Sequence, residues 1–512
     1  MITDANACEV LVVGAGPTGL VCALWLARLG VRVRIIDRLE DAAPFSRALG
    51  VHARTLEFYR QMGFADEVVA GGVIVGSANL WSERHRVARA EFGNIGEGMT
   101  RFPFVLDFAQ DQHERLLIGK LATFGVAVER DSELVALEHG ARDVTATVRH
   151  AGGATTSVRC AYVAGCDGSH SAVRGALGVE FGGGTYERLF YVADVAARGP
   201  AVDDGIHVDL DEADLLALFD MKGTGHVRLV GTVLASAVQQ RDRPLGFDDV
   251  ARRPIDQLAL KIERVNWFST YRVHHRVASR FRVGNTFLLG DAAHVHSPVG
   301  AQGMNTGIGD AINLAWKLAA AIRRGADDAL LDTYEAERRA FALRLVATTD
   351  RAFEIASKPG RVAAFVRTSL FPVFVSAFFR LRATRQFLFR TVSQLAIAYH
   401  ESALSEGSAG RVRAGDRLPW VPLAHDTDNH EALSSLRWQV HMYGGLTAAI
   451  RRACEERSVE AHEFAWTDAM ARAGLSRGAV YLVRPDGYVA FADASANADR
   501  LAAYVERWSC GA

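Results

Sequence analysis

A glycine-rich junction between a predicted strand and a predicted helix, near the start of the chain, places the strongest constraint on the fold. The apolar run Val10–Val13 leads into Gly14-Ala-Gly16-Pro-Thr-Gly19, and a helical pattern follows that Gly30 closes. Residues 31–36 form a second predicted strand, which ends at Asp37. A strand-helix-strand unit of about 30 residues is typical of a parallel sheet with helical crossovers. The sequence therefore predicts an α/β fold of the Rossmann type.

The three glycines of this junction have separate roles in a dinucleotide site. Gly14 allows the tight turn, Gly16 lets the backbone approach a pyrophosphate, and Gly19 lets the helix pack closely on the strand. The phosphates would lie at the N-terminus of the helix, where free N–H groups point outward. Asp37 suits the ribose hydroxyls and repels a 2′-phosphate, which favours FAD or NAD over NADP at this site. A purely structural glycine turn is the alternative.

A second strand end of the same kind lies near residue 290. Phe287-Leu-Leu-Gly-Asp291 is a buried strand that ends on a carboxylate, and a glycine-containing loop through Pro298 opens a helix near Gly303-Met-Asn305. Asp291 can accept hydrogen bonds from the ribityl hydroxyls of FAD, whereas NAD needs only the first unit. The helix N-terminus would stabilise anionic reduced flavin by about 0.3–2 kcal/mol, and about 1.4 kcal/mol corresponds to about 30 mV. FAD is therefore the predicted cofactor.

A third strand-to-helix junction contains Asp167-Gly168, after a strand predicted at 162–166. Asp167 either caps the helix that follows or contacts a cofactor. The three junctions, in this order, resemble those of the class A flavoprotein aromatic hydroxylases, the p-hydroxybenzoate hydroxylase-like FAD monooxygenases, over most of residues 8–345. The resemblance implies that the first junction holds the ADP part of FAD, that Asp167-Gly168 serves both FAD and NAD(P)H, and that Gly290-Asp291 contacts the ribityl region.

The resemblance also implies roles for residues outside the junctions. Arg47 matches the arginine that reaches the FAD pyrophosphate, and Gln110 matches an FAD-contacting glutamine. Met304 and Asn305 match backbone positions at the pyrimidine edge of the flavin, and Pro298 matches the proline whose backbone lies beside the reacting flavin face. The candidate cofactor-binding residues are Gly14, Gly16, Thr18, Gly19, Asp37, Arg38, Arg47, Gln110, Asp167, Asp291, Gly303, Met304 and Asn305. No metal site is predicted.

Aromatic hydroxylation is the reaction that the resemblance implies. NADPH or NADH reduces FAD, O2 adds at flavin C4a, and the flavin C4a-hydroperoxide transfers one oxygen atom to a phenolic or aromatic polyketide substrate. Water must be excluded while the hydroperoxide exists, and a buried base or proton relay must help the phenol ionise. No catalytic residue is assigned, although His226, His274, His275 and His296 lie in plausible regions.

Other functions account for parts of the sequence. A Baeyer–Villiger or epoxidising flavin monooxygenase acting on a polyketide would use the same scaffold. A flavin halogenase fits less well, because no WxWxIP-type segment is present and Trp81 is followed by Ser-Glu-Arg. A non-catalytic NAD-binding protein would leave Asp291 and its loop without a role, and a membrane quinone-ring hydroxylase would rest only on the apolar stretch 362–379.

The predicted domain organisation begins with a discontinuous FAD-binding domain in residues 1–185 and 277–345. Residues 186–276 alternate polar and apolar side chains, which predicts a mostly antiparallel β lobe that binds substrate over the cofactor. A helical segment follows in residues 346–404, and the polar, glycine-containing stretch 405–411 is predicted to be a linker.

Residues 412–512 are predicted to form a separate C-terminal domain. Arg484-Pro-Asp-Gly487 is a turn sequence between two strand-like runs and predicts a β-hairpin. This stretch is similar to the thioredoxin-like C-terminal domain of the phenol hydroxylase and polyketide hydroxylase branch. Because Cys454 has no CxxC partner there, the resemblance implies packing or dimerisation rather than thioredoxin activity, and a monomer or homodimer is expected.

Charge and cysteine usage argue against several other classes. The net charge is -1 at pH 7, which gives no field that would favour nucleic acid or an anionic membrane surface. The six cysteines form no CxxC pair, which argues against a disulfide framework, a dithiol site or a zinc site. The stretch 362–379 contains Arg367 and Pro372 and falls short of about 20 apolar residues, so stable membrane insertion is not expected. With no basic and then apolar leader, a cytoplasmic protein is expected.

Overall fold

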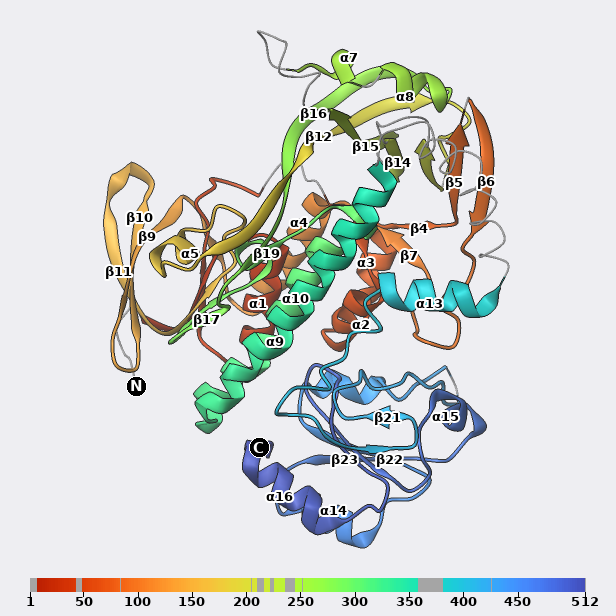
Figure 1. The fold of residues 1–512 in the computed structure, drawn as a ribbon. Helices are drawn as coiled ribbons and strands as arrows, with labels where there is room; N and C mark the ends of the chain where they lie inside the picture. The colour runs from red at the N-terminus through yellow and green to blue at the C-terminus, as the bar shows by residue number, and fades with distance from the viewer. Residues whose placement is uncertain are drawn as a thin grey trace.

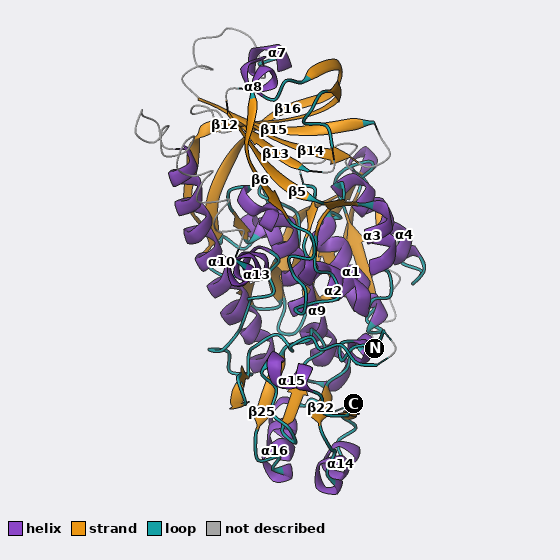
Figure 2. Ribbon diagram, turned by 90° about the vertical axis from the view of Figure 1, so that its right-hand side faces the viewer, coloured by secondary structure: helices purple, strands orange, loops and turns teal. Residues whose placement is uncertain are grey.

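The computed structural model has three tiers, which Figures 1 and 2 show from two sides. A body with a mainly parallel sheet lies in the middle, a second sheet lies above it, and a smaller α/β domain formed by the C-terminal residues lies below. The structure describes residues 7–42, 48–82, 84–203, 205–209, 216–221, 225–234, 245–250, 252–357, 381–424 and 426–511. The predicted fold class, a Rossmann-type domain with a β lobe and a thioredoxin-like C-terminal domain, is confirmed.

The central sheet has the strand order β17-β18-β11-β1-β2-β8. Its strands are β1 (Ala7–Val13), β2 (Val33–Ile36), β8 (Val128–Glu129), β11 (Thr155–Gly165), β17 (Arg282–Val283) and β18 (Thr286–Leu288). β1 runs parallel to β2 and β11, with Val13 opposite Ile36 and Gly165. β11 runs parallel to β18, with Gly165 opposite Leu288. The carboxyl ends of these four strands therefore lie along one edge of the sheet.

Helix α1 (Pro17–Arg28) packs against both α4 (Gln110–Ala122) and α9 (Gln302–Arg324). α1 is buried along most of its length, and Trp25 at its centre is fully enclosed. A helix that is apolar all round belongs in an interior. It ends before Gly30, which has a φ of +76°, as the sequence predicts. The apolar stripe of α9 also packs into this core, so its first turn is held firmly.

Smaller elements surround the central sheet. They are β3 (Gly50–Val51), α2 (Ala53–Gln61), α3 (Ala65–Gly71), β4 (Val73–Val75), β7 (Val105–Asp107), β9 (Ser132–His139), β10 (Val144–His150), a 3-10 turn (Ala151–Gly153) and α5 (Ala172–Ala176). β11 is longer than the strand predicted at 162–166, because its first half pairs antiparallel with β10. The apolar alternation before residue 162 therefore belongs to a hairpin that continues into the parallel sheet.

The upper sheet has eight strands in the order β19-β16-β12-β15-β14-β13-β5-β6. They are β5 (Ser77–Ser82), β6 (His85–Glu91), β12 (Phe181–Arg198), β13 (Ile206–Asp209), β14 (Leu216–Met221), β15 (His226–Leu234), β16 (Lys261–Ala278) and β19 (His294–Val295). The predicted antiparallel pairing holds except between β13 and β5, which are parallel. Strands β5 and β6 were expected within the FAD-binding domain, and their place in this sheet corrects that expectation. Short helices α7 (Phe247–Val250) and α8 (Arg252–Gln257) cover the upper sheet.

Two further helices follow α9. The long helix α10 (Asp328–Ser357) runs diagonally from the lower body toward the upper sheet, and α13 (Arg382–Val392) lies at the right of the body in Figure 1. The apolar stretch 362–379 lies outside the described residues. Among the helices that the structure does describe, we find none that combines the length and hydrophobicity of a membrane span.

The C-terminal domain contains a six-stranded sheet in the order β21-β20-β25-β24-β22-β23. Its elements are β20 (Glu406–Ala409), β21 (Val412–Arg413), a 3-10 helix (Glu431–Ser435), β22 (Gln439–Tyr443), α14 (Ala448–Glu455), β23 (Glu460–Phe464), α15 (Asp468–Ala473), β24 (Val480–Val483), β25 (Val489–Asp493) and α16 (Ala498–Trp508). The hairpin predicted around residues 484–487 joins β24 to β25 and is confirmed. All six cysteines are buried and free.

The predicted linker at residues 405–411 is wrong, because β20 pairs parallel with β25 inside the C-terminal sheet. Gly407 has a φ of +86°, and a methyl group on it would lie 2.3 Å from the backbone oxygen of Ala492. The glycine therefore serves close strand packing rather than flexibility. Sequence composition alone does not distinguish these two uses, since the partner strand is more than 80 residues away.

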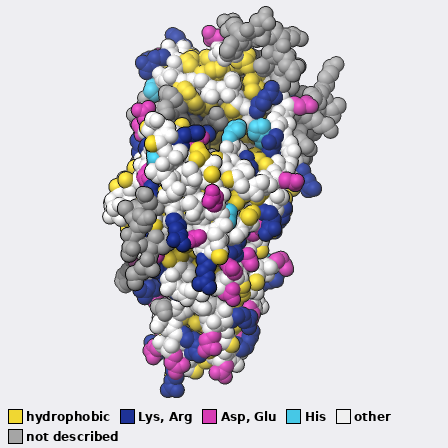
Figure 3. Space-filling view, turned by 90° about the vertical axis from the view of Figure 1, so that its left-hand side faces the viewer, with side chains coloured by type: hydrophobic (Ala, Val, Ile, Leu, Met, Phe, Trp, Pro, Cys, Tyr) yellow, Lys and Arg dark blue, Asp and Glu magenta, His cyan; other side chains and the backbone are white. Residues whose placement is uncertain are grey.

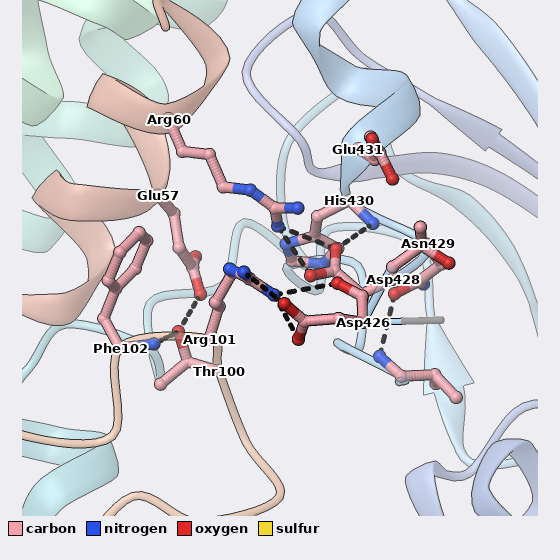
Figure 4. A network of polar contacts seen from close by, with 12 residues as sticks. Glu57, Arg60, Thr100, Arg101, Phe102, Asp426, Asp428, Asn429, His430 and Glu431 are labelled. Carbon is pink, nitrogen blue, oxygen red and sulfur yellow. Dashed lines mark hydrogen bonds and ion pairs between the residues drawn. The ribbon is translucent and has the colours of Figure 1, made fainter. Parts of the chain in front are cut away.

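Charged side chains join the C-terminal domain to the body (Figure 4). Arg60 on α2 pairs with buried Asp428 at 2.7 Å, and Arg101 pairs with exposed Asp426 at 3.2 Å. Deeper in the interface, Glu57 accepts hydrogen bonds from Arg54 and Arg417, each at 2.8 Å. The two parts are therefore held by a polar interface with a buried centre.

A second buried ion network lies beside the 484–487 hairpin. Arg484 pairs with Glu337 of α10 at 2.7 Å and with Asp486 at 2.5 Å. Glu337 also pairs with Lys317 of α9 at 3.0 Å, and all of these side chains are almost completely buried. The network therefore joins the hairpin to α9 and α10, and removing one member would leave an uncompensated buried charge.

Candidate cofactor-binding site

The predicted binding motifs converge on the carboxyl edge of the central sheet. The register places Gly14 after β1, Asp37 after β2, Asp167 after β11 and Gly290 after β18. Backbone hydrogen bonds from Gly14 N to Ile36 O (2.8 Å) and between neighbouring strands fix these turns beside one another. Segments that are far apart in the sequence therefore form one continuous rim at the edge where ligands bind in open α/β sheets.

Each glycine of the first turn has the geometry that its predicted role needs. Gly14 has a φ of +101°, and a methyl group on it would lie 2.4 Å from the backbone oxygen of Cys166. A methyl group on Gly19 would lie 1.9 Å from the backbone oxygen of Gly14. At Gly16, in contrast, a methyl group would meet no atom within 4 Å. Gly14 and Gly19 are thus required by packing, whereas Gly16 faces open space in front of the N-terminus of α1.

Asp37 is bonded to the glycine loop itself. Its Oδ2 accepts a hydrogen bond from Ala15 N at 2.6 Å, and its Oδ1 accepts one from Leu39 N at 2.9 Å. Arg130 lies 4.0 Å from the same carboxylate. Each carboxylate oxygen retains a second lone pair, so Asp37 can hold the loop and still accept from a ribose hydroxyl.

Thr18 links the two predicted halves of the site. A methyl group on Gly290 would lie 2.7 Å from Thr18 Oγ1, and one on Gly307 of α9 would lie 2.3 Å from the same oxygen. The first turn of α1 therefore packs directly against the turn after β18 and against α9. This contact requires a small side chain at all three positions and brings the two helix N-termini close together.

Asp167 caps α5. Its Oδ1 accepts a hydrogen bond from Ser171 Oγ at 2.5 Å, and its Oδ2 accepts one from Val173 N at 3.0 Å. Burial raises its pKa, and these hydrogen bonds oppose the rise. Arg174 then donates to the backbone oxygen of Ala292 at 2.9 Å, which ties this junction to the turn after β18. Asp167 thus helps to hold the start of α5, and its contact with a cofactor stays a prediction.

Asp291 stands in a 3-10 turn (Gly290–Ala292) and is exposed. The turn is fixed from behind by Asp310 of α9, whose Oδ2 accepts from Gly290 N at 3.0 Å and from His294 Nε2 at 2.7 Å. Arg338 of α10 donates to Asp310 Oδ1 at 2.6 Å. Burial raises the pKa of Asp310. The charges and hydrogen bonds of Arg338 and His294 lower it by more than burial raises it, so the pKa is below its ordinary value. Asp310 belongs to none of the sequence motifs, although it holds the turn that carries Asp291.

The loop before α9 has the backbone geometry of a turn that exposes N–H groups. Pro298 is exposed, Gly300 has a φ of +76°, and Ala301 has a φ of +52° directly before the helix begins. The first N–H groups of a helix have no intrahelical acceptor. A methyl group on Gly303 would come no closer than 3.9 Å to His296 Nε2, so the backbone of this turn is accessible.

Asn305 is buried, and its side chain is fully used within the protein. Its Oδ1 accepts from His52 N and Thr55 Oγ1 at 2.9 and 2.8 Å, and its Nδ2 donates to Gly50 O and Ala301 O at 2.9 and 3.0 Å. The side chain therefore fixes the segment around residue 50 against α9. Asn305 is the fourth residue of α9, so the free N–H groups of this helix end belong to the residues before it, among them Gly303 and half-buried Met304.

Buried polar atoms without a partner among the described residues lie next to this loop. They include His52 Nδ1, His296 Nε2 and Ser297 Oγ. Burial lowers the pKa of both His52 and His296 to about 4, so both rings are neutral at pH 7. Because His296 Nδ1 donates to the Ser297 backbone oxygen at 2.8 Å, its Nε2 carries a lone pair. Unpaired buried atoms of this kind suit a bound polar group.

The contacts of the remaining predicted residues do not point to a particular part of the cofactor. Gln110 begins α4 and donates to Glu114 Oε1 at 2.8 Å, and Arg38 is exposed beside Asp37. Arg47 lies outside the described residues. Of the histidines considered for catalysis, His226 lies at one end of β15, while His274 and His275 lie on β16 opposite the start of β12.

The residues present fit FAD. A helix N-terminus with open space at Gly16 suits a pyrophosphate, Asp37 suits a ribose, and the exposed Asp291 beside the N-terminus of α9 suits a ribityl chain and an anionic flavin edge. Within the described residues, no cluster of His, Cys, Asp and Glu could hold a metal ion.

Comparison with known proteins identifies related sequences along the whole chain. Residues 7–349 match the family described as an FAD binding domain, and residues 411–512 match the family described as the C-terminal domain of aromatic-ring hydroxylases. The 6-methylpretetramide 4-monooxygenase of Streptomyces rimosus is 34% identical over 96% of this chain and 91% of its own length. The pentachlorophenol 4-monooxygenase of Sphingobium chlorophenolicum is 33% identical over 69% of this chain and 65% of its own length.

Solved structures show the same similarity. OxyS, an anhydrotetracycline hydroxylase from Streptomyces rimosus, superposes with a TM-score of 0.79 at 28% identity and covers 98% of this chain and 99% of its own. CabE, an aromatic hydroxylase from angucycline biosynthesis, superposes with a TM-score of 0.78 at 28% identity and covers 99% of both chains.

Proposed function

Because this chain belongs to the FAD-dependent aromatic-ring hydroxylases, we propose that it uses NADPH or NADH to hydroxylate a phenolic ring of an aromatic polyketide. The observation that carries this proposal is the shared edge on which Gly14, Asp37 and Gly290 lie, with the first turn of α1 packed through Thr18 against Gly307 of α9. One long cofactor can reach both helix ends there.

The residues of this edge would hold FAD along its length. The Gly14–Gly19 turn would bind the pyrophosphate, Asp37 the adenosine ribose and Asp291 the ribityl chain, while the first N–H groups of α9 would face the pyrimidine edge. Bound FAD supplies a two-electron carrier between a hydride donor and O2. The dipole of α9 stabilises negative charge at that edge, so it favours reduction.

The neutral imidazole of His296 gives the site a hydrogen-bond acceptor. Its Nε2 lone pair is buried beside the first turn of α9, where it can accept from a donor on the cofactor or on a phenol. With a pKa of about 4, the His296 ring is unprotonated at pH 7. We propose that it orients a hydroxyl or N–H group, and the base that ionises the phenol stays unassigned.

A group of cationic side chains is the proposed docking point for the reductant. Burial lowers the pKa of His274 on β16, and the neighbouring groups Arg276, His170, Arg272 and His275 contribute to the same shift. Burial also lowers the pKa of Arg174 on α5, with Asp167 opposing this shift and Arg276 adding to it. These mutual effects indicate a positive potential that an anionic pyrophosphate would relieve. The nearby carboxylates are Asp350, 3.9 Å from His275, and Asp167.

Figure 3 faces the side of the molecule on which α5 and the lower part of β16 lie. It shows a hollow below a group of hydrophobic side chains, with histidine and basic side chains around its mouth. A pyridine nucleotide carries a flat ring and two phosphates, so it suits a hollow with an apolar upper wall and a cationic rim. We propose that NADPH or NADH binds here to reduce FAD.

The substrate class is proposed from the similar proteins. Relatives are named for 6-methylpretetramide and anhydrotetracycline, one for pentachlorophenol, and CabE for angucycline biosynthesis. A phenolic ring is common chemistry for oxygen transfer of this type, because an ionised hydroxyl donates electrons to its ortho and para carbons. A polycyclic phenol is therefore the first substrate to test.

The test uses the purified full-length chain. It should carry a yellow chromophore with flavin absorbance bands, and it should oxidise NADPH or NADH faster when a polycyclic phenol is added, with peroxide measured in parallel. Absence of bound flavin after incubation with FAD, or no phenol that accelerates oxidation, would overturn the proposal. With ¹⁸O2, label on a ring carbon indicates hydroxylation, whereas label inside a new ester indicates the Baeyer–Villiger alternative.

A further inference from the structure

A cavity of about 640 Å³ lies between the middle of α10 and residues 391–402. Its volume falls within the range of about 300–1,000 Å³ that is usual for small-molecule sites. The cavity extends to Gly300 and Gln302, which belong to the loop that opens α9. None of the described residues that line it belongs to the upper sheet, so it is distinct from the surface that this sheet presents to the cofactor edge.

The walls of this cavity suit a flat, uncharged ring system. Phe341, Leu345 and Ile397 provide apolar and aromatic surface, and Thr348 and Thr391 add hydroxyl groups. These hydroxyls donate to backbone oxygens of their own helices, which leaves their lone pairs as acceptors. Aromatic rings pack well against side chains of this kind, and phenolic hydroxyls can donate to the acceptors.

The charges around the cavity do not call for an ionic ligand. Glu337, the buried carboxylate among the described lining residues, is already paired with Lys317 and Arg484. His400 is bonded to Asp416 at 2.7 Å. The other charged side chains of the wall, Arg344 and Glu401, are exposed to solvent and opposite in sign.

An amide pair joins the cavity to the cofactor edge. Gln394 donates to Gln302 Oε1 at 2.8 Å and to Thr306 Oγ1 at 2.9 Å, and Gln302 donates to Val392 O at 3.0 Å. Gln394 has a φ of +61°, which is uncommon for a residue other than glycine. Strained backbone of this kind persists where surrounding contacts fix it, and here the contacts are those of the first turn of α9.

We propose that this cavity binds the rings of a polycyclic substrate that lie away from the ring to be hydroxylated. The proposal rests on the proposed function and narrows its substrate class, because a single phenol ring fills only a small part of this volume. The Gln302–Gln394 pair then forms the boundary between the distal rings and the loop beside the flavin. A monocyclic phenol would be bound without help from this cavity.

Two tryptophan variants of α10 test the proposal in the FAD-loaded full chain. Thr348 and Ala347 are adjacent and both exposed, but only Thr348 is among the described residues that line the cavity. Thr348→Trp places a large side chain in the cavity mouth, and Ala347→Trp is the matched control. The probe is 1,8-dihydroxyanthraquinone, a tricyclic phenol, and its dissociation constant is measured from the change in flavin absorbance.

We expect Thr348→Trp to weaken binding of the tricycle at least about tenfold, with Ala347→Trp within about twofold of the unchanged protein. Phenol-stimulated NAD(P)H oxidation should be the same in all three proteins. Equal affinity of Thr348→Trp and unchanged protein, or no binding of the tricycle to either, would overturn the cavity inference alone. Failure of the unchanged protein to bind FAD or to oxidise NAD(P)H would instead overturn the proposed function.

Discussion

Asp310 and Gly290 are joined by a hydrogen bond of 3.0 Å from the Gly290 backbone nitrogen to Asp310 Oδ2. The same carboxylate accepts from His294 and Arg338 and is completely buried. A charged side chain of α9 therefore holds the turn that carries Asp291. The position of one proposed FAD contact depends on a residue that faces away from the cofactor edge.

Asp310→Asn should destabilise the protein by about 3–5 kcal/mol, because Arg338 is left buried without its counter-ion. FAD affinity should fall with it, since the turn at Gly290 loses its anchor. Urea unfolding and flavin titration measure the two effects. Asp332→Asn, which removes an exposed partner of Arg282, is the control and should cost no more than about 1 kcal/mol. Equal stability of the two variants would contradict the role given to Asp310.

The same pair has a pH signature. The folded pKa of Asp310 is below its ordinary value, so its contribution is complete above the unfolded pKa of about 3.9 and is lost as the pH falls through the folded pKa. The stability difference between the unchanged protein and Asp310→Asn should therefore be constant near neutral pH and shrink in acid. A difference that grows toward low pH would contradict this assignment.

Gly16→Ala should weaken FAD binding at least about tenfold and leave the free energy of unfolding of the apoprotein almost unchanged. The methyl group would meet no protein atom within 4 Å, but it would occupy the space proposed for the pyrophosphate. Gly119→Ala in α4 is the matched control, because its methyl group also meets no atom within 4 Å and lies away from the motif. Equal FAD affinity in both variants would show that the pyrophosphate does not lie at Gly16.

Glu57→Gln should destabilise the docking of the C-terminal domain by about 3–5 kcal/mol, since Arg54 and Arg417 are both buried around it. Asp426→Asn, in the same interface (Figure 4), should have no measurable effect because Asp426 is exposed. Thermal unfolding of the full chain compares the two. The pKa of Glu57 is lowered, as Arg417 and Arg54 outweigh its burial, so the difference should disappear only in strong acid.

Arg276→Gln should raise the KM for NADPH or NADH about tenfold or more and leave kcat at saturation nearly unchanged, because one charged contact to the pyrophosphate is lost. Arg264→Gln lies on the same strand, far from the cationic group, and is the control. An unchanged KM would place the reductant elsewhere.

The reductant should also bind more tightly as the pH falls. The pKa of His274 is lowered in the free protein by burial and by Arg276 and His170, and a phosphate beside it would raise that pKa. Binding then takes up a proton, so the KM should be lower at about pH 6 than at about pH 8. Initial rates across this range test the sign, and a KM that falls with rising pH would contradict it.

The convergence of the binding motifs could be predicted from the sequence because it follows from local rules. Residues that directly follow parallel strands lie at the same edge of the sheet, and this holds for Gly14 after β1, Asp37 after β2 and Gly290 after β18. The hairpin at residues 484–487 was predictable for the same reason, since its turn residues are adjacent in the sequence.

Elements that depend on distant partners were not predictable. β5 and β6 join the upper sheet through β13, about 130 residues later, and no local pattern specifies that pairing. Asp310 could have been recognised from the sequence, because it is a charged residue within the apolar face of α9, next to Ile308 and Ala311. A charge in such a stripe must find a buried partner, and here three donors from different elements meet it.

The parallel pairing of β20 with β25 sets where the chain can be cut. The family match for the C-terminal domain begins at residue 411, but β20 spans Glu406–Ala409. An expression fragment that starts at 411 would present β25 with an unsatisfied edge and invite self-association. A fragment intended for separate crystallisation or binding studies should therefore start upstream of Ser405, with the whole strand retained.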